Sequence, residues 1–121
     1  MSDVAIRGID IHTYLVKDAD RAIGFWRDTM GLKETWIMEG MGAEFELPDG
    51  STFGLWKLDD TEGGWTKGNG IMFAVDNIDE AVAHFQSRNV QFFHREETPV
   101  CHMAFASDTE GNTFVVHQRK T

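Results

Sequence analysis

The sequence has little cysteine and no long apolar segment. Cys101 is the single cysteine among 121 residues, so no internal disulfide can form, and this is typical of a reducing cytoplasm. No apolar run approaches the roughly 18 residues that span a bilayer. The first ten residues, MSDVAIRGID, lack the apolar core of a signal peptide. We therefore expect a cytoplasmic protein with no membrane partner.

Basic residues are also scarce. Eleven Lys and Arg residues against twenty Asp and Glu residues give a formal net charge of −9. Nucleic-acid affinity rests on clustered Lys and Arg side chains, so we expect no nucleic-acid partner. The negative charge favours solubility, and a sharper interpretation is that it favours cationic ligands.

What the sequence does contain is a packed core and an internal repeat. A hydrophobic share of 41%, with nine Phe and four Trp residues, predicts one domain over residues 1–121. YLVKDADRAIGFW, which begins at Tyr14, aligns with FAVDNIDEAVAHF, which begins at Phe73. LPDGSTFGLWK, from Leu47, aligns in the same way with DTEGNTFVVHQ, from Asp108. The repeat predicts module one at about 7–58, a Gly-rich connector at 59–69 and module two at about 70–120.

Each module predicts one strand, one helix and three further strands. The first helix is expected from about Ala19 to Met30, capped by Asp18 and ended by Gly31. The second begins after Asn77, where NIDE resembles a capping box, and stops near Asn89. The turns PDGS and TEGN place Gly where a positive φ is tolerated. The strands are expected near Ile9–Val16, Glu34–Glu39, Gly42–Leu47, Thr52–Leu58, Gly70–Val75, Gln91–Glu96, His102–Ser107 and Thr113–Gln118.

Alternation along the strands predicts which side chains share a face. Phe53, Leu55, Phe114 and Val116 are bulky and suit packing against the helices. The opposite face then carries Trp56 in module one and His117 at the matching position of module two. A Trp and a His can together hold a planar ligand. A His side chain titrates near neutral pH, so it can also act as an acid, a base or a hydrogen-bond partner. The predicted ligand-binding residues on this face are Thr13, Leu15, Trp56, Met72 and His117.

FWRDTMGL, from Phe25, and SDTEGNTFVVHQRK, from Ser107, together with V-x-x-x-D before each helix, resemble the vicinal oxygen chelate superfamily. That group includes glyoxalase I, extradiol dioxygenases and bleomycin-binding proteins. The resemblance implies an α+β fold in which two βαβββ modules form curved mixed sheets around a shared cavity. The helices then lie on the outer face, and the chain forms a homodimer.

Metal-dependent members of that family take ligands from positions that correspond here to Ile11, Gly54, Gly70 and Val115. None of these residues has a side chain that binds a metal. We therefore expect no cofactor and a small-molecule ligand, as in the bleomycin-resistance branch. The alternative is a divalent metal held by an unusual set, His12, Glu44, Glu46 and His117. That set implies a glyoxalase-like lyase or an extradiol dioxygenase-like oxidoreductase, and whether the protein is an enzyme stays open.

Cys101 and two histidines, His12 and His102, are also weighed as candidates for chemistry. His12 lies one residue beyond the first family ligand position, and only a β-bulge would turn it into the cavity. We interpret it as a half-buried or hydrogen-bonded structural residue. Cys101 and His102 are neighbours on one strand and point to opposite faces, which excludes a ready thiolate–imidazolium pair.

Overall fold

The computed structural model describes residues 6–58 and 67–120, and within them two modules of the same layout. Module one contains β1 (His12–Val16), α1 (Ala19–Gly24), the π-helix η1 (Phe25–Thr29), β2 (Lys33–Met38), β3 (Gly42–Glu46) and β4 (Thr52–Lys57). Module two contains β5 (Ile71–Ala74), α2 (Ile78–Gln86), β6 (Phe92–Glu97), β7 (Cys101–Ser107) and β8 (Thr113–Arg119). The predicted α+β fold of two βαβββ modules is confirmed. Most of the predicted connector, 59–66, lies outside the described residues.

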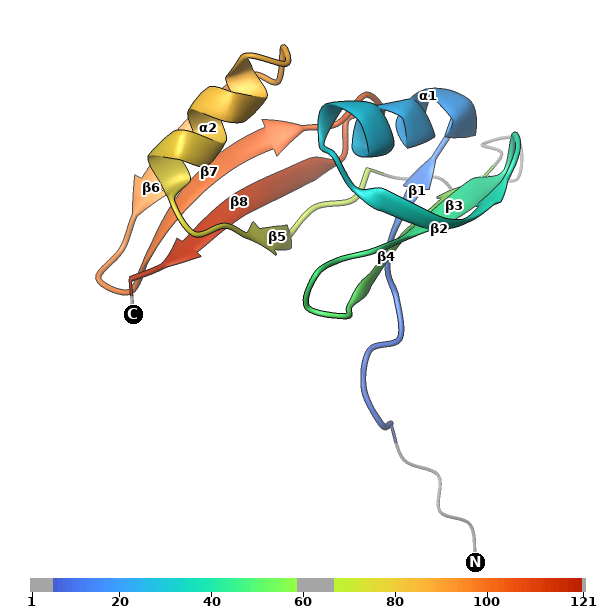
Figure 1. Ribbon diagram of the computed structural model, residues 1–121, viewed down its shortest axis with the longest axis horizontal. Coiled ribbons are helices and arrows are strands. Elements are labelled where there is room, and N and C mark those ends of the chain that lie inside the picture. The colour runs from blue at the N-terminus through green and yellow to red at the C-terminus, as the bar shows by residue number, and fades with distance from the viewer. Residues whose placement is uncertain (1–5, 59–66, 121) are drawn as a thin grey trace, which may run out of the picture.

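Each module folds into a four-stranded mixed sheet with the same strand order. The orders are β1-β4-β3-β2 and β5-β8-β7-β6, and only β1–β4 and β5–β8 are parallel pairs. The shared topology agrees with the repeat read from the sequence. In Figure 1, α1 and α2 lie on the same side of the two sheets. No described helix covers the opposite side, which leaves one face of each sheet open.

One aromatic core lies between the helices and the sheets. Trp26 is fully buried at its centre, with ring centroids 4.7 Å from Phe53, 4.9 Å from Phe114 and 5.3 Å from Phe73. Phe53 belongs to module one and the other two rings to module two. The modules therefore share one core, and burial of this much aromatic area contributes strongly to their association.

Both helices begin at the predicted caps, and α2 ends at Gln86, three residues before the predicted Asn89. The Asp18 carboxylate accepts from the Arg21 N–H at 3.1 Å, and the Asn77 side chain accepts from the Glu80 N–H at 3.0 Å. The chain leaves the first helical segment through Gly31 (φ +80°) and the second through Asn89 (φ +69°). Both are residues that tolerate the left-handed region.

The second half of the first helix is a π-helix, which the sequence did not predict. It is α-helical only to Gly24 and continues as a π-helix, in which the Met30 N–H donates to the Phe25 carbonyl at 2.9 Å. Consecutive side chains diverge less around this wider turn. Phe25 and Trp26 are neighbours in sequence, and both rings contact Phe114. The wider turn thus points two adjacent aromatic residues at one core.

Candidate functional site

The open face of the first sheet is an aromatic and acidic surface. Strand register shows which residues stand side by side, and such neighbours share a face. One row across the sheet is Thr13, Gly54, Glu44 and Trp36, and the next is Leu15, Trp56, Gly42 and Met38. Trp36, Met38 and Trp56 are 43%, 46% and 39% exposed. Large apolar side chains gathered in this way mark a binding surface more often than chance exposure.

The Trp56 indole packs directly against Gly42 on the neighbouring strand. A Cβ added to Gly42 would stand 2.8 Å from the Trp56 ring and 2.3 Å from the Leu55 carbonyl oxygen. Only a residue without a side chain lets the indole lie so close to the strand. The glycine therefore fixes where Trp56 sits on the open face.

The open face of the second sheet combines thioether, aromatic and imidazole groups. Its rows are Met72, Val115, Phe105 and His94, then Ala74, His117, Met103 and Glu96. His94 Nε2 lies 3.3 Å from Glu96 Oε2, and the His94 ring centroid lies 5.4 Å from that of Phe105. Met72 is 51% exposed, and His117 is half-buried. This face can therefore offer both apolar contact and a proton donor or acceptor.

The five predicted ligand-binding residues fall into two groups. Thr13, Leu15 and Trp56 share the open face of the first sheet, while Met72 and His117 share that of the second. The structure thus bears out their predicted faces, and their binding of a ligand stays a prediction. Further residues of the same faces were not predicted as ligand-binding, although alternation along the neighbouring strands indicates them. They are Trp36, Met38, His94, Met103 and Phe105.

The positions at which the wider family places metal ligands do not fit a metal here. A Cβ on Gly54 would meet the Ile11 methyl at 3.1 Å and the Thr13 hydroxyl oxygen at 3.4 Å, so these two side chains fill the space of a ligand. Val115, at the matching position of module two, is a buried aliphatic residue. Neither position has a nitrogen, oxygen or sulfur donor in its side chain.

The unusual metal set of His12, Glu44, Glu46 and His117 is not brought together either. Within residues 6–58 and 67–120, no three His, Cys, Asp and Glu side chains lie close enough to hold an ion. Glu44 and Glu46 do stand on the open face, opposite Gly54 and Thr52. His12 stands opposite Phe53, a helix-side residue, and the β1–β4 register runs unbroken from that pair to Val16–Lys57. Without a bulge, His12 cannot reach the open face.

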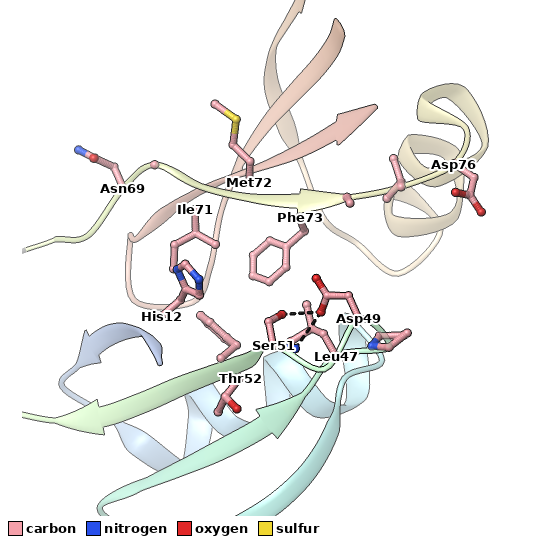
Figure 2. Close-up of a pocket in the computed structure, with 15 residues that line it drawn as sticks. His12, Leu47, Asp49, Ser51, Thr52, Asn69, Ile71, Met72, Phe73 and Asp76 are labelled. Carbon is pink, nitrogen blue, oxygen red and sulfur yellow. Dashed lines mark hydrogen bonds between the residues drawn. The ribbon is translucent and has the colours of Figure 1, made fainter. Parts of the chain in front are cut away.

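The interpretation of His12 as a half-buried residue is wrong. Its side chain is exposed, at the mouth of a cleft between the modules. Figure 2 shows the His12 ring next to Ile71, across from β5. Because β1 begins at His12, three residues later than expected, the strand leaves this side chain at its end without neighbours to cover it.

The predicted turn around Gly111 also joins the two modules. Asn112 is fully buried, and its amide donates to the Leu15 carbonyl at 3.2 Å and to Asp108 Oδ2 at 3.1 Å. The Asp108 carboxylate in turn accepts from the Trp26 indole at 3.4 Å. Buried polar groups that are this well paired fix a geometry. The segment holds β1 against module two and so sets how the two open faces lie.

Tyr14 makes a second link between the modules. Its hydroxyl donates to the Thr113 carbonyl at 2.5 Å and accepts from the Ile71 N–H at 3.3 Å. Burial raises the pKa of Tyr14 to about 12. The hydroxyl therefore keeps its proton, and with it the donated hydrogen bond, across the physiological pH range.

Comparison with known proteins assigns the chain to a family. A family model described as the Glyoxalase/Bleomycin resistance protein/Dioxygenase superfamily matches residues 8–116, and the chain belongs to this superfamily. The family resemblance predicted from the sequence is thereby confirmed. No curated protein sequence matches the chain.

Three solved structures illustrate the shared fold. Lactoylglutathione lyase from Agrobacterium tumefaciens is 20% identical, with 93% of this chain and 94% of that chain covered and a TM-score of 0.79. TnmS3, an antibiotic binding protein from Streptomyces sp. CB03234, is 23% identical, with 97% and 99% covered and a TM-score of 0.78. A glyoxalase/dioxygenase from Nostoc punctiforme is 19% identical, with 100% and 99% covered and a TM-score of 0.75. At these identities the similarity shows the fold alone.

The longest described helix, α2, has nine residues, and none of the described helices qualifies as a membrane span.

Proposed function

We propose that this protein binds a small organic molecule on the open faces of its two sheets, without a metal ion in the site. The ligand has a planar or apolar body with polar or positively charged groups. The observation that carries the proposal is Trp56, held over Gly42 on a sheet face that also exposes Trp36 and Met38. Aromatic and thioether surfaces of this kind suit the apolar part of a ligand.

Charge supports the cationic part of the proposal. Glu44 and Glu46 stand on the first open face and Glu96 on the second, within a chain of net charge −9. Carboxylates beside aromatic rings favour a ligand that carries a positive charge, which both groups attract. His117 and His94 add hydrogen-bonding groups on the second face.

Two copies of the chain complete the proposed site. In the part of the chain that the structure describes, no helix covers either open face, whereas binding sites enclose most of a ligand's surface. A homodimer in which open faces meet encloses the ligand between them. TnmS3, which has this fold, is described as an antibiotic binding protein, and an antibiotic is one kind of small organic molecule.

Replacing Trp56 tests the proposed site. Planar aromatic compounds, each paired with an uncharged analogue, are screened by isothermal calorimetry against the wild-type protein. Trp56→Ala is expected to weaken the best cationic binder by about tenfold or more, because it removes a large central aromatic contact. Trp56→Phe keeps a ring on Gly42 and should retain most of the affinity. Equal affinities for wild type and Trp56→Ala would remove Trp56 from the site.

Metal content tests the second part of the proposal. Protein purified without chelator should contain well under one equivalent of any transition metal. A stoichiometric metal ion would overturn the metal-free site and favour the enzyme alternative, in which His12, Glu44, Glu46 or His117 must move to bind it.

A further inference from the structure

A cleft of about 700 Å³ lies between the two modules, on another side of β5 from the open faces. One wall is the whole of β5 with its flanks, residues 69–76, and the other is the β3–β4 turn, residues 47–53 without Gly50, with His12 at one end. Figure 2 shows Ile71 and Phe73 pointing into the cleft and Met72 pointing away from it. The cleft meets the open faces only at Met72, Ala74 and Thr52, and neither Trp56 nor His117 lines it. Its centre therefore differs from that of the site proposed above.

The inner part of the cleft is apolar. Phe53 is buried at its base, and Leu47, Ile71, Phe73 and Val75 are partly buried around it. Phe53 and Phe73 meet edge to face, with centroids 5.4 Å apart. Partly exposed aromatic and aliphatic side chains at the end of a core still gain free energy when a ligand covers them.

One carboxylate at the rim is held in a fixed orientation. Asp49 Oδ1 accepts from the Ser51 hydroxyl at 2.6 Å and from the Ser51 N–H at 2.9 Å. These hydrogen bonds lower the pKa of Asp49, and the charge of nearby His12 acts in the same direction. Asp49 is therefore ionised at neutral pH. Figure 2 shows Asp49 across from Phe73, with a second carboxylate, Asp76, beyond the end of β5 and His12 at the other end of the cleft.

We propose that this cleft is a second binding site, which takes a small organic cation: a protonated amine on an apolar body. The apolar body lies against Phe53 and Phe73. The ammonium group has three donors, and the Asp49 carboxylate accepts from it. A carboxylate ligand is excluded by repulsion from Asp49 and Asp76, and a neutral analogue loses the ion pair.

Three probes of one shape test the proposal: 2-phenylethylamine, its alcohol analogue 2-phenylethanol and the anion 3-phenylpropanoate. Each is titrated into ¹⁵N-labelled protein while amide chemical shifts are recorded. The amine is expected to shift the amides of Gly50, Ser51 and residues 72–75 to saturation, and to bind about fivefold more tightly than the alcohol, the gain of one exposed ion pair. The anion should leave these amides in place.

Asp49→Asn is the matched variant. The Asn side-chain oxygen can still accept from Ser51 and keep the turn, while the charge is lost. This variant should bind the amine about fivefold more weakly and the alcohol as before. Glu80→Gln removes the same charge from an exposed residue of α2 outside the cleft, and should change neither affinity.

Three results would overturn the second site. They are equal affinities for amine and alcohol, an Asp49→Asn variant that binds the amine as wild type does, and shifts confined to the amides around Trp56 and His117. In the third case the amine occupies the open faces, which leaves the proposed function in place. If the cleft binds the amine but Trp56→Ala binds every screened compound as wild type does, the proposed function fails and this second site stands.

Discussion

Glu110 shows how a single residue ties the modules together. Its side chain is almost fully buried, and it accepts from the N–H groups of Lys17 and Asp18 at 3.1 and 2.9 Å and from the Arg21 guanidinium. Burial acts to raise the pKa of Glu110, but the hydrogen bonds from Asp18, Arg21 and Lys17 outweigh it and leave the pKa lowered. One carboxylate of module two thus satisfies three groups at the start of α1.

A carboxyl whose pKa is lower in the folded than in the unfolded state stabilises the fold above its unfolded pKa, about 4.3 for Glu. That contribution is lost as the pH falls through the folded value. Glu110→Gln should therefore lower the free energy of unfolding by about 1–2 kcal/mol at neutral pH, since it replaces charged hydrogen bonds by neutral ones. The loss should shrink as the pH falls through the lowered pKa of Glu110, below which the wild-type side chain is protonated too. Urea unfolding over a series of pH values from neutral into the acid range measures it, and a loss that does not change with pH would contradict the prediction.

The alternation of side chains along a strand predicts the face of a single residue reliably only inside a regular strand. It assigned Trp56 and His117 to the open faces, because both lie within unbroken register with their neighbours. It also set His12 on the other face, and the structure agrees. Whether His12 was covered could not be predicted, because that depends on the other module and on where β1 begins.

The bounds of helices and strands were predicted mostly from short-range sequence patterns, such as apolar alternation and turn residues. The predicted bounds of β3, β4, β7 and β8 lie within one residue of the observed ones at either end. Gly50 and Gly111 adopt the positive φ that their turns require. The π-helix at Phe25–Thr29 was missed, because the apolar spacing of Ala22, Ile23 and Trp26 fits an α-helix equally well. Its cause is the shared aromatic core, which no local pattern records.

The cap of α2 gives a prediction at this scale. The Asn77 side chain accepts from the Glu80 N–H at 3.0 Å. Asn77→Ala removes this bond and should lower the free energy of unfolding by about 1 kcal/mol, as measured by chemical denaturation. Asn77→Asp keeps the acceptor and places a negative charge at the helix N-terminus, so it should be neutral or stabilising. Equal losses in both variants would show that the cap does not stabilise α2.

At the scale of the whole molecule, the sequence predicted the two modules but not the space between them. The cleft beside β5 is formed by residues 12, 47–49, 51–53 and 69–76, which no local pattern joins. Its position depends on how Trp26, Tyr14 and Asn112 hold one module against the other. Side-chain faces follow from a period of two, whereas the packing of two sheets follows from long-range contacts that a single sequence does not display.

The net charge of the chain should make its dimerisation depend on salt concentration. Each copy carries a net charge of −9, so two copies repel one another, and salt screens that repulsion. The proposed homodimer should therefore dissociate in dilute buffer and strengthen as the salt concentration rises, as followed by analytical ultracentrifugation. Trp36→Glu places a further charge on the open face and should leave only monomer. Val100→Glu makes the same change at an exposed apolar residue of the β6–β7 turn and should leave the dimer intact. If Trp36→Glu dimerises as wild type does, the open face of the first sheet is not the surface that joins the copies.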